Sequence, residues 1–162
     1  MKSARLLVLV LLGPLALFTG CAKQAAGPAA VVPPAKHEHH PPHGGTPVVL
    51  GNEIYHVELV RDAATGKLSA YVLDGEMENF IRSAALSFEI NATVDGQPKL
   101  LTLRALANPA TGETAGDTAL FETQADWLKT TKSFDGKIKS LTIRGTTFTN
   151  VDFNFPEGND KD

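Results

Sequence analysis

After its first 45 residues the chain becomes a succession of short segments with alternating apolar and polar residues, separated by turn residues. Such alternation is typical of β-strands with one buried face. The clearest pair is Leu86–Val94 and Pro98–Leu106, which flank Asp95-Gly96, a dipeptide that favours a two-residue hairpin turn. In that hairpin Phe88 faces Leu103. This spacing constrains the fold more than any other feature of the sequence.

Further strands are predicted on both sides of this hairpin, with almost no helix. They cover residues 48–50, 54–61, 68–74, 118–122, 137–144 and 146–155. Phe148 is out of phase with Val151, which indicates a β-bulge near Asn150. Seven or eight short strands at this spacing predict an all-β domain over residues 46–157, followed by a polar tail at 158–162. An immunoglobulin-like two-sheet antiparallel sandwich fits best, and a partly open β-barrel is the alternative.

The first strand pair carries the fifth histidine of the chain, His56. If Gly51-Asn52 forms a tight turn, His56 faces Pro47, and the alternation places His56 and Glu58 together on the solvated face, about 7 Å apart along the strand. The same register brings His43 back beside them. The group of His43, His56 and Glu58 is therefore a candidate metal site. The alternative is an exposed histidine and an exposed glutamate on a solvated strand.

The other four histidines are clustered just before this strand pair. His37, Glu38, His39, His40 and His43 lie within seven residues of one another. Neutral imidazole is the commonest protein ligand of borderline divalent metals, so the cluster predicts binding of Zn²⁺, Cu²⁺ or Ni²⁺, with none of them required for folding. Pro41-Pro42 excludes a helical site and makes the cluster an extended chelate. The alternative is a solvent-exposed linker that is rich in histidine.

The N-terminal region has the features of an export signal. Lys2 and Arg5 precede the apolar run Leu6–Phe18, which is shorter than the about 20 residues of a membrane span. The following Thr19-Gly20-Cys21 resembles a bacterial lipobox, in which the cysteine is acylated with fatty acids such as palmitate. We therefore expect a lipoprotein signal peptide at residues 1–20 and lipid on Cys21. Residues 21–45, rich in Ala, Pro and His, are then a tether.

Charge and motifs exclude two classes of function. Removal of Lys2 and Arg5 leaves 13 basic residues against 18 acidic ones, a net charge of −5, so nucleic-acid binding is not expected. A Ser-His-Asp arrangement, a free thiol nucleophile and a Gly-rich phosphate loop are all missing from the sequence, so we do not expect an enzyme.

Three segments together resemble a family of small exported bacterial proteins. The residues that carry the resemblance are His43-Gly44-Gly45, Tyr55–Val60 and Tyr71–Asp74. Similar segments precede the adaptor regions of heavy-metal efflux systems, although this chain lacks the long coiled-coil hairpin of an adaptor. The resemblance implies an accessory of metal efflux or homeostasis. Together with Cys21 it predicts a lipid-anchored protein of the cell envelope. Ala22 stands where an Asp would resemble an inner-membrane retention signal, so the periplasmic face of the outer membrane is expected. The alternative is an envelope structural or interaction domain with an incidental His-rich linker.

Overall fold

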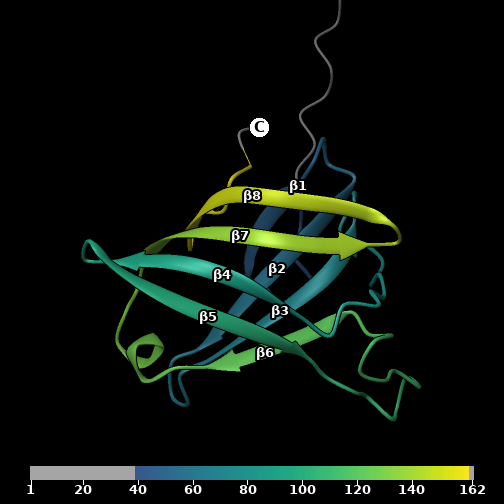
Figure 1. The fold of residues 1–162 in the computed structure, drawn as a ribbon, viewed down its shortest axis with the longest axis horizontal. Helices are drawn as coiled ribbons and strands as arrows, with labels where there is room; N and C mark the ends of the chain where they lie inside the picture. The colour runs from purple at the N-terminus through teal and green to yellow at the C-terminus, as the bar shows by residue number, and fades with distance from the viewer. Residues whose placement is uncertain (1–38, 161–162) are drawn as a thin grey trace, which may run out of the picture. The chain divides into compact units, whose positions relative to one another are not determined.

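The computed structural model describes residues 39–160 and shows an all-β domain of eight antiparallel strands (Figure 1). The strands are β1 (Thr46–Leu50), β2 (Tyr55–Asp62), β3 (Lys67–Asp74), β4 (Ser87–Val94), β5 (Gln97–Ala105), β6 (Leu120–Gln124), β7 (Phe134–Ile143) and β8 (Thr146–Phe155). A single 3₁₀ turn, η1 (Asp126–Lys129), separates β6 from β7. The predicted signal peptide, Cys21, His37 and most of the predicted tether lie outside the described residues.

The eight strands form one sheet in the order β1-β2-β3-β6-β5-β4-β7-β8. The sheet curls on itself, so that β4, β5 and β7 cross in front of β2 and β3 in Figure 1. The predicted all-β class of seven or eight antiparallel strands is confirmed, and the number is eight. A single, nearly closed sheet is the architecture of the alternative, the partly open barrel, rather than of two separate sheets.

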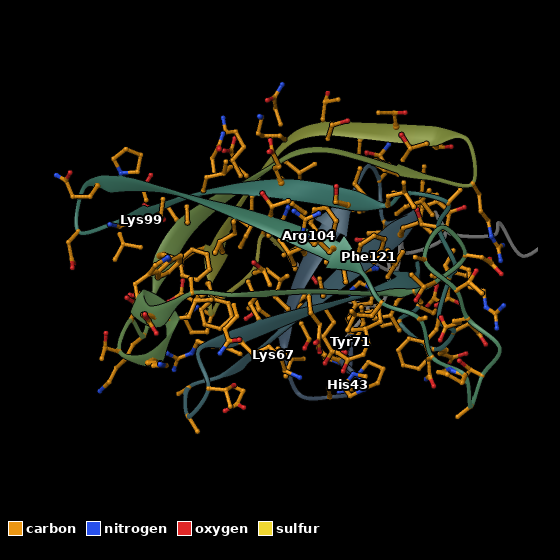
Figure 2. All side chains as sticks on the ribbon, turned by 60° about the horizontal axis from the view of Figure 1, so that its bottom comes forward. His43, Lys67, Tyr71, Lys99, Arg104 and Phe121 are labelled. Carbon is orange, nitrogen blue, oxygen red and sulfur yellow. The ribbon has the colours of Figure 1, made fainter. Side chains whose placement is uncertain are left out.

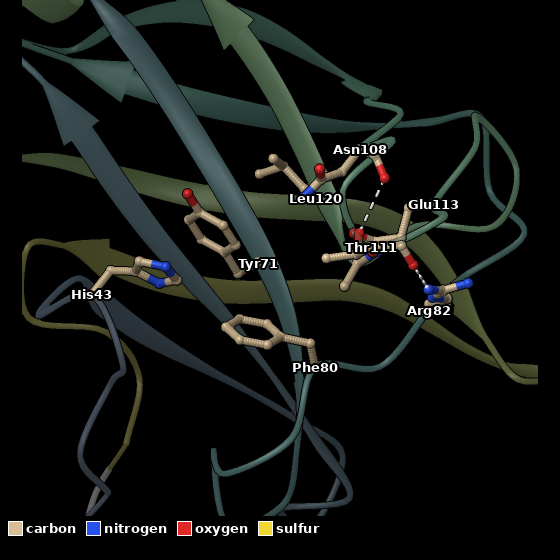
Figure 3. A pocket seen from close by; sticks show the side chains of 9 residues that line it. His43, Tyr71, Phe80, Arg82, Asn108, Thr111, Glu113 and Leu120 are labelled. Carbon is tan, nitrogen blue, oxygen red and sulfur yellow. Dashed lines mark hydrogen bonds between the residues drawn. The ribbon is translucent and has the colours of Figure 1, made fainter.

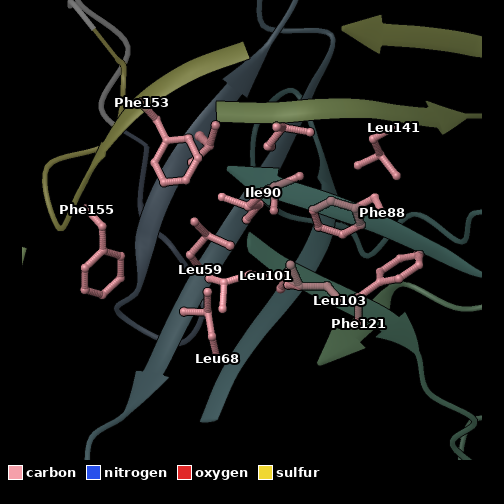
Figure 4. Close-up of a cluster of buried hydrophobic side chains, with 14 of the residues drawn as sticks. Leu59, Leu68, Phe88, Ile90, Leu101, Leu103, Phe121, Leu141, Phe153 and Phe155 are labelled. Atoms are coloured by element: carbon pink, nitrogen blue, oxygen red, sulfur yellow. The ribbon is translucent and has the colours of Figure 1, made fainter. Parts of the chain in front are cut away.

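The hydrophobic core fills the inside of this curled sheet (Figure 4). Inward side chains of β2 and β3, such as Leu59 and Leu68, face those of β4 and β5. Phe88 of β4 packs edge-to-face on Phe121 of β6, with ring centroids 5.2 Å apart. Burial of these alternating side chains is the main force that holds the barrel closed.

Two hairpin registers differ in how well they agree with those expected from the sequence. The β4–β5 register is confirmed, with Phe88 opposite Leu103. The predicted β1–β2 register is wrong by two residues, since Val49, not Pro47, lies opposite His56. The reason is the turn, which has four residues, 51–54, instead of the expected two.

The β7–β8 ladder is interrupted at the predicted place, near Asn150, but not by the predicted β-bulge, because neither strand has an extra residue. The ladder pairs Ile138 with Val151 and Ser140 with Thr149, but it skips Lys139 and Asn150. Asn150 has a left-handed backbone, with a φ of 53°. Because one residue leaves the ladder on each strand, the register is kept while the inward face changes phase on both strands. Phe148 and Phe153 therefore both reach the core.

The two edge strands, β1 and β8, are joined by the residues after β8. We call Pro156–Asp160 the C-terminal strap. Its Asn159 side chain accepts a hydrogen bond from the Val49 N–H at 2.7 Å and donates one to the Val49 carbonyl oxygen at 3.2 Å. Gly158 has a φ of 85°, and a Cβ there would clash with the carbonyl oxygen of Pro47. Part of the predicted polar tail thus belongs to the barrel. In residues 39–160 no helix has the length and apolar character needed to cross a membrane.

Candidate functional site

The outer face of β2 is covered, and this overturns the expectation that His56 and Glu58 are solvated. Both residues are fully buried. The segment 39–45 lies over them, and the loop after β3 contributes Met77, which is buried but does not belong to the cluster of core side chains. The barrel therefore has a second, partly polar layer outside β2 and β3.

The Glu58 carboxylate holds the segment before β1 in place. Its Oε1 accepts hydrogen bonds from the backbone N–H groups of His43, at 2.7 Å, and Gly45, at 2.9 Å. Its Oε2 lies 2.8 Å from Nδ1 of His43. Gly45 is required for this close approach, because a Cβ would come within 2.6 Å of the Leu59 carbonyl oxygen. A buried carboxylate with three donors is satisfied without any metal ion.

The His43 ring is also fixed from its other side. It stacks on Tyr71 of β3, with centroids 3.9 Å apart and an interplanar angle of 17°. Phe80 lies next to both rings, at 5.8 Å from His43 and 6.0 Å from Tyr71. Figure 2 shows His43 and Tyr71 side by side on one flank of the barrel. His43 thus lies beside Glu58, although not through the predicted register, and the two side chains hold each other in place instead of forming a metal site with His56.

His56 has a different environment, with one ring nitrogen bonded and the other without a partner. Nδ1 lies 3.2 Å from the carbonyl oxygen of Asp74, which can only accept, so Nδ1 carries the proton. Burial lowers the pKa of His56 below its usual value of about 6.5, which favours the neutral ring. Nε2 then presents a bare lone pair. Among the buried side-chain nitrogen and oxygen atoms of the described residues, Nε2 of His56 is the one that lacks a hydrogen-bond partner.

His39 lies directly against this ring. The centroids of the His39 and His56 rings are 4.4 Å apart, with an interplanar angle of 55°. The His39 side chain is only 4% exposed, and its Nδ1 lies 3.0 Å from a carboxylate oxygen of Asp160 in the C-terminal strap. In the neutral form of His39, Nδ1–H donates to that carboxylate and Nε2 carries the lone pair. Two imidazole rings therefore meet at the start of the domain.

The six predicted metal ligands are thus separated into different environments. His43 is paired with Glu58 and His39 with His56, while His40 is exposed and His37 is outside the described residues. Among residues 39–160 no group of three or more His, Cys, Asp or Glu side chains is arranged to hold a metal ion. The predicted chelate of His43, His56 and Glu58 is not assembled, because His43 and Glu58 satisfy each other.

A cleft of about 390 Å³ opens beside the His43 side chain that is bonded to Glu58 (Figure 3). Tyr71 and Phe80 line one side, and Arg82 and Glu113 lie at the other. The polar groups are engaged with their neighbours: Arg82 bonds Asp117 at 3.0 Å, and Glu113 accepts from the Ala119 N–H at 2.8 Å. The cleft is large enough for a small ligand, but its polar groups do not point to any particular ligand chemistry.

Sequence reasoning missed Asp160, Asp74 and Tyr71 as parts of this region. Asp160 and His39 are separated by 121 positions in the chain, and the Asp74 contact uses a backbone oxygen, so neither leaves a local pattern. The outward positions of Tyr71 and Leu73 on β3 were the available signal, since large apolar residues on a supposedly solvated face indicate a covering layer. No family model, no curated protein and no solved structure matches this chain.

Proposed function

We propose that this chain is a lipid-anchored protein of the bacterial cell envelope that binds a divalent metal ion, Zn²⁺, Cu²⁺ or Ni²⁺, through His39 and His56. The adjoining His37 and His40 would supply further imidazoles. The observation that carries the proposal is the buried, unpartnered Nε2 of His56 beside the ring of His39.

The arrangement around the two rings favours a metal ion over a simple core histidine. A buried polar atom without a partner costs about 1–3 kcal/mol, and a metal ion would remove that cost at His56. Each Nδ1 is bonded to an oxygen, of the Asp74 backbone for His56 and of the Asp160 carboxylate for His39. Metal-binding histidines typically have this second bond, which sets the tautomer and orients the ring.

Two fixed imidazoles leave coordination positions open for water or for the tether. Such a site binds more weakly than a closed structural zinc site, whose four protein ligands leave no open position. Weak, exchangeable binding suits capture and transfer of metal, as in an accessory to efflux or homeostasis, rather than catalysis. The sequence resemblance to segments of efflux systems supports the same role.

The metal site is tested by titrating the full mature chain with Zn²⁺ and Ni²⁺ at pH 7.5 in a calorimeter. We expect the wild type to bind and His56→Gln to lose about tenfold or more in affinity. His43→Gln removes the same number of imidazoles but should keep the affinity within about threefold, because His43 is bonded to Glu58. Circular dichroism shows whether both variants remain folded. Equal losses in the two folded variants would mean that any histidine serves, and the folded site would be wrong.

The anchor is tested separately, by metabolic labelling with a clickable fatty acid. We expect the label on the wild type and none on Cys21→Ser, because the thiol is the acylation site. A wild type that takes up no label and does not fractionate with membranes would rule the anchor out.

A further inference from the structure

The C-terminal strap contacts both the edge of the barrel and the histidine pair. We propose that metal binding at His39 and His56 stabilises the contact of this strap with β1. Metal binding would then also stabilise the seam of the barrel, by which we mean the junction between the edge strands β1 and β8. This inference rests on the proposed metal binding and adds a consequence for the fold: the metal-free protein opens its seam more readily than the metal-bound protein.

The first link is between the strap and β1. The side-chain amide of Asn159 pairs with both the N–H and the carbonyl oxygen of Val49, as a neighbouring strand would. Thr46 adds a hydrogen bond from its hydroxyl to the carbonyl oxygen of Pro156, at 3.0 Å. These bonds occupy the outer edge of β1, whose other edge pairs with β2. An open strap would leave this edge unpaired, and unpaired edges are sites where other strands add.

The second link is between the strap and the metal site. Asp160 follows Asn159 directly, and its carboxylate lies 3.0 Å from Nδ1 of His39. A metal ion on Nε2 of His39 withdraws electron density from the ring and makes Nδ1–H a stronger donor, which strengthens the bond to Asp160. Asp160 is a positioning residue in this scheme, since it holds the ring and does not itself bind the metal.

The two links together require reciprocal coupling. If metal favours the closed strap by some factor, the closed strap favours metal binding by the same factor. Asp160→Asn weakens the link to His39 and leaves Asn159 in place. We therefore expect this variant to bind Zn²⁺ about 10- to 100-fold more weakly, the range typical for loss of an outer-sphere carboxylate.

Hydrogen exchange at the Val49 N–H reports the position of the strap, because its acceptor is Asn159. Exchange is measured by NMR on the full mature chain with and without saturating Zn²⁺. We expect Zn²⁺ to slow Val49 exchange in the wild type, with a smaller effect in Asp160→Asn. The Leu59 N–H, in the core of β2, is the reference for global unfolding. Asp152→Asn, an exposed carboxylate that pairs with Lys137, is the control and should behave as the wild type.

The outcomes separate this inference from the metal site itself. Zinc binding with equal affinity in wild type and Asp160→Asn, and with unchanged Val49 exchange, would overturn the coupling and leave the metal site standing. Slowing of Val49 and Leu59 by the same factor would also overturn it, because the effect would then be global. A wild type that binds no zinc would overturn both proposals.

Discussion

Phe88→Ala is expected to destabilise the domain by about 3–5 kcal/mol. Phe88 is 3% exposed, and its ring packs edge-to-face on Phe121 in the centre of the barrel. Truncation removes the buried area of the ring, leaves a cavity between β4 and β6, and loses the aromatic contact. Domains of this size have a total stability of about 5–15 kcal/mol, so the variant should be close to unfolding at moderate temperature.

Urea denaturation followed by circular dichroism measures this effect. The matched control is Phe80→Ala, the same truncation at a side chain that is 49% exposed beside the cleft. Its cost should be about 1 kcal/mol or less, since most of the ring already contacts water. If the two truncations shifted the midpoint equally, Phe88 would not be part of a packed barrel core.

The fold class was predictable because alternation and turn chemistry are local. Asp95 and Gly96 have φ angles of 50° and 75°, the left-handed pair that a two-residue hairpin turn needs, and the sequence Asp-Gly indicates it directly. The choice between sandwich and barrel was not predictable in this way. It depends on pairings between distant strands, β3 with β6 and β6 with β5, that the same alternation allows in either architecture.

The β1–β2 register illustrates a related limit. A shift of two residues leaves every side chain on the same face of the sheet, because the side-chain period of a strand is two. The alternation therefore placed His56 and Glu58 correctly on one outer face, but it could not distinguish the four-residue turn from a two-residue one. The longer turn contains Glu53 in a left-handed conformation, with a φ of 55°. Because glutamate rarely adopts that conformation, its presence in the sequence did not indicate such a turn.

The sequence indicated several residues of the candidate site, but it did not indicate how they are arranged. The return of His43 toward Glu58 was predicted from a β1–β2 register that is wrong by two residues, so the contact itself, through the His43 N–H and ring, was not foreseen. The burial of His56 did not follow, because it requires the segment at His39 and, through Asp160, the far end of the chain. Coverage of an outer sheet face by a non-local segment is a tertiary event that strand periodicity does not encode.

The second large effect on stability is expected at Glu58, whose carboxylate bonds the segment before β1. Glu58→Ala is expected to cost about 3–5 kcal/mol, comparable to breaking a buried ion pair. The substitution leaves the N–H groups of His43 and Gly45 without their acceptor and removes the partner of the His43 ring. Each unsatisfied buried group costs about 1–3 kcal/mol, although His43 itself is partly exposed and water can reach it.

Glu58→Gln separates the shape of this side chain from its charge. Its amide oxygen can still accept from both backbone N–H groups, while the charged acceptor facing His43 is lost, so we expect a smaller loss of about 1–2 kcal/mol. Glu89→Ala, which removes a carboxylate from a surface pair with Lys139, should cost at most about 1 kcal/mol. Urea denaturation at pH 7.5 ranks the three variants. If Glu58→Ala proved no more costly than Glu89→Ala, the segment before β1 would not be held by this carboxylate.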